Sequence, residues 1–174
     1  MERADDGAAV AASLESSLDA LTFTNLAADE ISTRLIESVA GWARAQGWRV
    51  YRRAPSVVRL PPPMQHRHSV VDVACARPSA PPVVVEVDRA DRARTLEKLI
   101  AEAAAGRVPI WLRWGTGGFT VPPPEIHLVT FEVTRATGGR FTRAAAPDLP
   151  APRHSPRVET TTAVELPLLP EQSP

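Results

Sequence analysis

The sequence has very little cysteine and lysine: Cys75 and Lys98 are the single representatives of their types among 174 residues. One cysteine excludes an internal disulfide framework and any zinc site built from cysteine pairs. No apolar run approaches the ~18 residues that a membrane-spanning helix needs. The N-terminus also lacks the basic flank and apolar stretch of a secretory signal. We therefore expect a cytoplasmic protein that does not bind a membrane.

Positive and negative charges cancel over the whole chain, but they are segregated along it. Residues 1–23 carry one base and five acids, a net charge of −4, and residues 147–174 carry two bases and four acids, a net charge of −2. Residues 24–146 carry 17 bases and 11 acids, a net charge of +6. A basic central part is compatible with a polyanionic partner such as nucleic acid. The alternative is an ordinary arginine-rich surface in contact with solvent.

The same three parts differ in composition. Residues 147–174 contain seven of the 18 prolines, which remove backbone donors, so a disordered Pro-rich tail is predicted. Residues 1–23 are rich in alanine and serine, and this composition predicts a weak helix or a disordered segment. Residues 24–146 have the length and the apolar residues for one α/β domain.

Apolar periodicity in the central part predicts alternating helices and strands. Apolar residues from Ile31 to Trp42 recur at steps of four, four and three, which is a helical spacing. Helices are predicted at 27–46 and 90–105, strands at 48–52, 70–76, 83–88, 108–114 and 126–133, and a proline-rich loop at 54–68. The order α-β-β-β-α-β plus one extra C-terminal strand indicates an α/β fold with a mixed central sheet flanked by helices. The first three strands should run antiparallel, and residues 83–114 should form a parallel crossover.

Asp72 and Glu86 each interrupt an otherwise apolar predicted strand, where a charge is costly unless it is paired or bound to a cation. If the turn between these strands is centred near Ser79, Asp72 lies opposite Glu86 with Cβ atoms ~5 Å apart. Strand alternation then places Asp88 on the same face. Like charges at this distance repel, and a divalent cation such as Mg²⁺ would neutralise them.

A purely structural explanation of these acids competes with the metal site. Three arginines follow the second acidic strand directly and would give ordinary salt bridges: Arg89, Arg92 and Arg94. Asp88 stands at a strand end, where it would only cap the next helix. The residues alone leave both explanations open.

Lys98 lies at the edge of the apolar face of the helix predicted at 90–105. From this position it could lean over the sheet toward the acids. A lysine amine is a compact charge whose pKa can fall, whereas an arginine stays protonated. One lysine among 19 arginines is therefore a candidate for a site that needs an amine. The alternative is a surface ion pair with Glu102, one helical turn away.

Three stretches, VVDVA at 70–74, VVVEVD at 83–88 and DRARTLEKL at 91–99, stand in an order of elements that resembles the PD-(D/E)XK nuclease superfamily. The resemblance covers residues 28–114, about half of the chain. It implies a restriction-endonuclease-like fold and a metal-dependent endonuclease that hydrolyses phosphodiester bonds, in DNA rather than RNA.

The resemblance also implies roles for individual residues. Asp72 and Glu86 would bind Mg²⁺ or Mn²⁺, which activates a water molecule. An acid on the first helix, Glu30 or Glu37, would join them. Arginines would contact backbone phosphates without reading sequence: Arg52, Arg53, Arg89, Arg92 and Arg94.

One departure from the family pattern decides between two functions. Asp88 occupies the position of the family lysine. If Lys98 reaches the site from the following helix, it can orient or deprotonate the water of an active enzyme. If it does not, the resemblance implies a catalytically inactive nuclease-fold module that binds nucleic acid or a protein partner.

Overall fold

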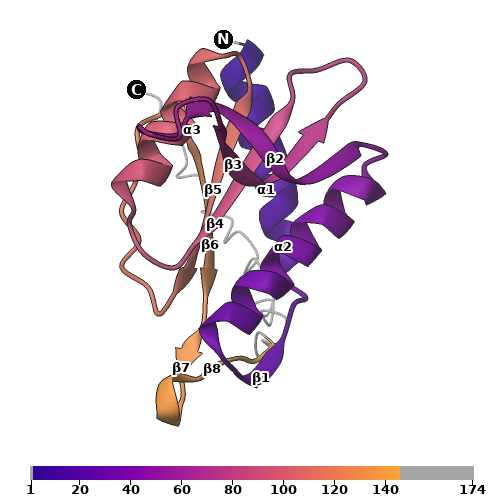
Figure 1. Ribbon diagram of the computed structural model, residues 1–174. Coiled ribbons are helices and arrows are strands. Elements are labelled where there is room, and N and C mark those ends of the chain that lie inside the picture. The colour runs from indigo at the N-terminus through magenta and orange to yellow at the C-terminus, as the bar shows by residue number, and fades with distance from the viewer. Residues whose placement is uncertain (1, 146–174) are drawn as a thin grey trace, which may run out of the picture.

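The computed structural model describes residues 2–145, which form an α/β fold. A five-stranded mixed sheet lies between helices, and a three-stranded antiparallel sheet lies at one end of it (Figure 1). The helices are α1 Glu2–Leu18, α2 Ala28–Ala45 and α3 Ala93–Ala104, with a 3₁₀ turn, η1, at Thr137–Gly139. The strands are β1 Phe23–Leu26, β2 Arg49–Arg59, β3 His68–Ala76, β4 Val83–Asp88, β5 Val108–Gly115, β6 His127–Glu132, β7 Thr134–Arg135 and β8 Phe141–Arg143.

The large sheet has the strand order β2-β3-β4-β5-β6. β2, β3 and β4 pair antiparallel, whereas β4, β5 and β6 pair parallel. A short turn after β3 permits an antiparallel neighbour, and the return from β4 to β5 passes through α3, as parallel neighbours require. The predicted mixed sheet, its antiparallel first strands and its parallel crossover are therefore confirmed, and β6 is the extra strand.

The pairing of β3 with β4 has the register that a turn centred near Ser79 predicts. Val73 pairs with Val85, Ala74 with Val84, and Cys75 with Val83. Continued by one residue, this register sets Asp72 opposite Glu86. Regular pairing stops just before that position, so the two acids lie where β3 and β4 begin to separate.

Each face of the large sheet has its own hydrophobic core. On the face covered by α1 and α2, Leu35 packs with Val85 of β4 in the main core. On the face covered by α3, Leu99 packs with Val84 of the same strand. Successive residues of β4 thus alternate between the two cores, as expected for a strand buried on both faces. Glu86 points to the α3 side, and this arrangement brings it under that helix.

The helix predicted within residues 1–23 is present as α1, Glu2–Leu18, but it packs on the domain instead of forming a separate segment. α1 buries Val10, Leu14 and Leu18 in the main core, next to β6 and α2. The alanine-rich sequence conceals this role because its partner, β6, lies more than a hundred residues later in the chain. The domain therefore begins before residue 24. The tail predicted at 147–174 lies outside the described residues.

β2 is also longer than predicted, and residues 54–59 belong to it rather than to a loop. Its ladder with β3 continues through Pro55, which pairs with Val70. Proline is tolerated here because β2 is an edge strand and needs a partner on one side only. The short strands β1, β7 and β8 were not predicted, because their two to four residues give no periodic signal. Within residues 2–145, no helix combines the length and apolarity needed to cross a membrane.

The side chain of Arg77 connects α1 to the turn between β3 and β4. Its guanidinium donates to the two carboxylate oxygens of Asp6 at 2.9 and 2.6 Å, and to the Pro81 carbonyl at 2.6 Å. The Arg77 side chain is 5% exposed, whereas that of Asp6 is 34% exposed. These hydrogen bonds hold the pKa of Asp6 below its ordinary value of 3.8.

Asp6→Asn should therefore weaken the protein at neutral pH more than in acid. A carboxyl with a lowered folded-state pKa contributes stability above its unfolded-state pKa, and this contribution is lost as the pH falls through the folded-state pKa. Because Asp6 is one-third exposed, we expect a loss of about 1 kcal/mol at pH ~7, shrinking below pH ~3. Thermal unfolding at both pH values tests this, with the more exposed Asp19→Asn as control. An equal loss at both pH values would contradict the assignment.

Candidate functional site

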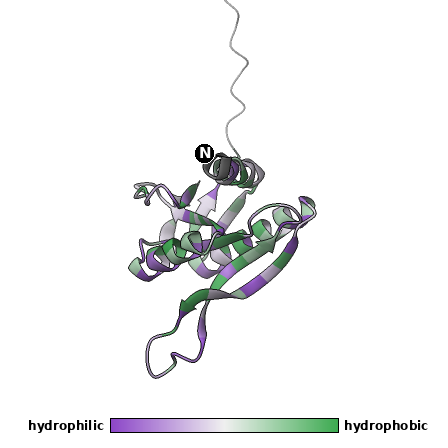
Figure 2. Cartoon of the chain, turned by 90° about the horizontal axis from the view of Figure 1, so that it is seen from above, coloured by the Kyte–Doolittle hydropathy of each residue, from purple (hydrophilic) through white to green (hydrophobic). Residues whose placement is uncertain are grey.

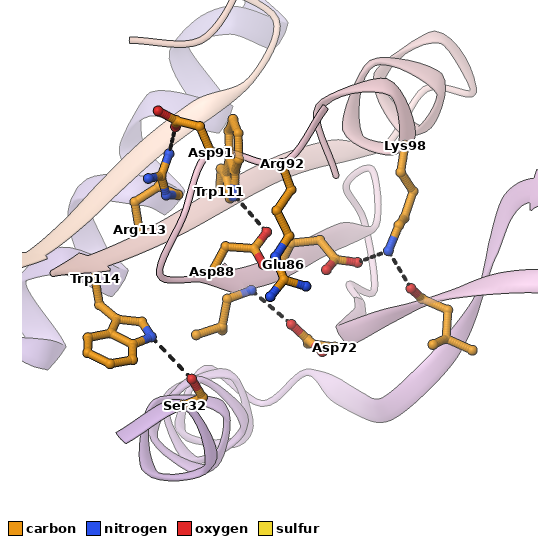
Figure 3. Close-up of polar contacts among 12 residues, drawn as sticks. Ser32, Asp72, Glu86, Asp88, Asp91, Arg92, Lys98, Trp111, Arg113 and Trp114 are labelled. Carbon is orange, nitrogen blue, oxygen red and sulfur yellow. Dashed lines mark hydrogen bonds and ion pairs between the residues drawn. The ribbon is translucent and has the colours of Figure 1, made fainter. Parts of the chain in front are cut away.

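A cleft of about 1130 Å³ opens where β3 and β4 separate. Its walls come from the start of α2, the ends of β2 and β4, the start of β3, the first turns of α3 and Trp114 of β5. Asp72, Glu86 and Lys98, which the sequence singled out, all line it. Figure 3 shows their side chains converging from β3, β4 and α3.

The two carboxylates are held in place by different hydrogen bonds. Asp72 Oδ2 accepts the backbone N–H of Val87 at 2.9 Å. Glu86 Oε1 accepts from Lys98 Nζ at 2.6 Å. The side chain of Glu86 is 8% exposed, and Asp72 is half-buried. The structure thus brings together the two acids that the strand register placed opposite each other.

Lys98 reaches the acids from α3. Besides Glu86, its Nζ donates to the backbone carbonyl of Val70 at 2.6 Å, and its side chain is 14% exposed. The alternative surface pair of Lys98 with Glu102 is wrong, because Glu102 turns away and pairs with Arg107 at 2.7 Å. The amine is therefore fixed between two strands, beside the cleft.

Burial and mutual repulsion make this cluster unfavourable for negative charge. Burial raises the pKa of Glu86 to about 7, opposed by the hydrogen bond from Lys98 and reinforced by the charges of Asp72 and Asp88. Burial also raises the pKa of Asp72, with Asp88 adding to the effect and the Val87 hydrogen bond opposing it. Asp88 is paired with Arg92, which leaves Asp72 and Glu86 with Lys98 as the near cation, so a bound cation would relieve the repulsion between the two acids.

Asp88 has partners of its own and is almost fully buried. Its Oδ2 accepts from the indole Nε1 of Trp111 at 3.1 Å, and its Oδ1 lies 3.4 Å from Arg92 Nε. For Asp88 the salt-bridge explanation therefore applies. The N-terminal cap of α3 is Arg92, without a side-chain hydrogen bond, so the capping explanation of Asp88 is wrong.

The acid that was expected to join Asp72 and Glu86 from the helix at 27–46, now α2, is neither Glu30 nor Glu37. Glu37 is half exposed and pairs with Arg52, away from the cleft walls. Glu30 accepts the N–H of Ala27 at 2.7 Å and thereby closes the start of α2. Asp29 lines the cleft instead. Asp29 and Ser32, three residues apart on α2, both line the cleft, so the helix was predicted correctly and only the face that it turns to the site was not.

The predicted phosphate-binding arginines divide into two groups. Arg89, Arg92 and Arg94 line the cleft, as does Arg59, which was not predicted. Arg89 also lies over the Phe141 ring, 4.8 Å from its centroid. The other two predicted arginines stand on β2 outside the cleft: Arg52, paired with Glu37, and Arg53, whose charge partly opposes the rise in the pKa of Asp72 that burial causes.

The turn that carries the cleft arginines after β4 is tied to β5. Arg113 is 4% exposed, lies 4.9 Å from the centroid of the Trp111 ring and forms an ion pair with Asp91. Asp91 also accepts a hydrogen bond from Thr120 at 2.9 Å. These contacts hold Asp91, which lies between the cleft residues Arg89 and Arg92.

The donor atoms suit a hard cation. In residues 2–145, no group of three or more His, Cys, Asp or Glu side chains is arranged around a common metal position. Mg²⁺ nevertheless usually takes one or two carboxylates together with water and phosphate oxygens. Asp72 and Glu86 each have a second oxygen for which residues 2–145 supply no hydrogen-bond donor. The pair therefore fits such a cation.

Comparisons of the chain with protein-family models, with curated proteins and with solved structures gave no match. The function proposed below rests on the residues and on their geometry.

Proposed function

We propose that this chain is a metal-dependent phosphodiesterase of the PD-(D/E)XK type that cuts DNA, with the restriction-endonuclease-like arrangement of its central elements. One observation carries the proposal: the amine of Lys98 lies 2.6 Å from Glu86, in the cleft that Asp72 also lines. A buried acid pair beside a fixed amine is costly for folding alone, which favours a chemical role for the cluster.

Asp72 and Glu86 are the residues that would hold Mg²⁺ or Mn²⁺ through their carboxylate oxygens. The cation would supply Lewis acidity, lowering the pKa of a bound water and balancing charge on the scissile phosphate. The cleft arginines would bind the flanking phosphates, which gives affinity without sequence specificity. Asp29, on α2, is a further acid at the same opening.

Lys98 supplies the amine that the family pattern expects two residues after Glu86. Its hydrogen bonds to Glu86 and Val70 orient Nζ without surrounding it, since three protons are available and two are donated. In our proposal the remaining proton is directed at water or at a phosphate oxygen in the cleft. The inactive-module alternative required Lys98 to point away from the acids, and its contact with Glu86 makes that alternative the weaker one.

Cation dependence is the direct test. The protein should nick supercoiled plasmid DNA with Mg²⁺ or Mn²⁺ and lose this activity in excess chelator. Calorimetric titration with Mn²⁺ should give an affinity that Asp72→Asn lowers by roughly tenfold or more, because one of two charged ligands is lost. Glu37→Gln, which removes an exposed acid away from the cleft, is the matched control. Chelator-resistant cleavage, or Mn²⁺ binding unchanged in Asp72→Asn, would contradict the proposal.

A further inference from the structure

The hairpin of β2 and β3 extends beyond the sheet as an ordered arm, residues 58–69. Figure 2 shows it standing out from the body of the fold. Arg59 pairs with His68 across the arm, and the Leu60 N–H donates to the Arg67 carbonyl at 2.8 Å. At the tip, Met64 N–H donates to the Pro61 carbonyl at 2.9 Å. The arm is therefore a defined two-stranded ribbon.

The arm combines positive charge with an apolar tip. It holds no acid, and its charged or titratable side chains are basic: Arg59, His66, Arg67 and His68. Three successive prolines, 61–63, and Met64 form the tip, and Met64 is 40% exposed. An exposed apolar tip on a basic ribbon does nothing for the folded core, which indicates an external partner.

The arm stands at the mouth of the candidate site. Arg59, Leu60, Pro61 and Ser69 line the same cleft as Asp72 and Glu86. A polymer whose phosphodiester bond lay in the cleft would therefore run along the arm. This step rests on the proposed function, whereas the shape and charge of the arm do not.

We infer that the arm grips duplex DNA. Its arginines would contact phosphates, and its Pro–Met tip would press into a groove against a base step. Two-stranded ribbons bind DNA in the major or the minor groove, and proline and methionine side chains act from the minor groove as wedges between base steps in proteins that bend DNA. The substrate of the cleft would then be double-stranded, and the arm would contact it beside the scissile bond.

A membrane surface would also attract basic and apolar groups. The arm favours DNA because its apolar tip is small and contains no aromatic residue, whereas membrane-binding segments bury a broad apolar face with tryptophan, phenylalanine or leucine. Single-stranded nucleic acid would need stacking rings, and residues 58–69 contain no phenylalanine, tyrosine or tryptophan.

Binding to a fluorescent ~30-base-pair duplex, measured by anisotropy in the presence of chelator, tests the arm independently of cleavage. Arg67→Ala should reduce the salt dependence of log K by about 1, and the affinity by about tenfold at ~0.1 M salt. Arg44→Ala, which removes an exposed arginine on α2, is the matched control and should change neither. Arg59 is less suitable, because its side chain also bonds the Gln65 carbonyl at 3.4 Å.

The tip is tested with a duplex that carries 2-aminopurine, whose fluorescence rises when a base is unstacked. Wild-type protein should raise the signal, and Met64→Ser should lose most of this rise, whereas Val121→Ser, at an apolar side chain that is 80% exposed, should not. Equal affinity for a single strand of the same sequence, binding to anionic lipid vesicles in place of DNA, or no effect of Arg67→Ala would each overturn the inference. Duplex binding through the arm without cleavage would support the arm and contradict the proposed nuclease.

Discussion

Lys98→Ala should lower the rate of the proposed Mg²⁺-dependent DNA cleavage by ~10²–10⁴-fold, the range observed when a positioned proton donor or charge stabiliser is removed. The amine of Lys98 lies 2.6 Å from Glu86, and its side chain is 14% exposed. Few other groups could replace it, because arginines, which stay protonated, are the other strong bases of this chain. Single-turnover cleavage of plasmid DNA measures the rate, and Arg44→Ala serves as the control.

Lys98→Arg separates two roles of this side chain. An arginine can keep an ion pair with Glu86, so the free energy of unfolding should stay within about 1 kcal/mol of wild type. Its guanidinium is wider than an amine and remains protonated, so cleavage should stay at least ~10²-fold below wild type. If Lys98→Arg cleaves like wild type, Lys98 only neutralises Glu86. Full activity of Lys98→Ala would remove Lys98 from the site altogether.

Glu102→Ala should destabilise the fold by about 3 kcal/mol, since it breaks a buried ion pair and leaves buried polar partners behind. Glu102 is fully buried. Its Oε1 accepts from Ser56 Oγ at 2.6 Å and from Val57 N–H at 2.9 Å, and its Oε2 accepts from Arg107 at 2.7 Å. This carboxylate therefore fastens α3 to the edge strand β2.

Chemical denaturation measures the change, with the exposed Glu97→Ala on the same helix expected within about 0.5 kcal/mol of wild type. Glu102→Gln keeps an acceptor for Ser56 and Val57 and should cost less than Glu102→Ala. A loss below about 1 kcal/mol for Glu102→Ala would show that β2 and α3 hold together without this carboxylate. Because α3 also carries Lys98, loosening this contact should reduce cleavage as well.

The parts of the site that follow from strand geometry could be predicted from the sequence. With a turn centred near Ser79, the order of residues places Asp72 beside Glu86, and the pairing of Val73 with Val85 confirms that register; a slip of one residue would have separated the two acids. The position of Lys98 is a weaker prediction, because an edge position on a helix is compatible with either neighbour. Packing of Leu99 into the α3-side core is what turns the helix so that Lys98 meets Glu86.

Features that depend on distant partners could not be predicted. α1 is held by β6 and by the Asp6–Arg77 contact, neither of which is visible in a local window.

The prediction of Glu37 failed for a different reason. Both Glu37 and Asp29 belong to a correctly predicted helix, but which of them faces the cleft depends on how α2 sits on the sheet. Pro55 also misled the prediction. A proline disrupts a central strand but is tolerated at a sheet edge, and the sequence near Pro55 does not show that β2 is an edge strand.

The hydrogen bonds of Asp72 and Lys98 have a consequence for how such a chain would diverge. Where β3 and β4 stop pairing, the Val87 amide is satisfied by Asp72 and the Val70 carbonyl by Lys98, so both side chains also complete the backbone of the sheet. A descendant that lacked the proposed nuclease activity would still be selected to keep them for folding. Among residues 2–145, the Glu86 carboxylate contacts Lys98 and no backbone donor. Of these three side chains, Glu86 should therefore be the first to be substituted once catalysis is no longer selected.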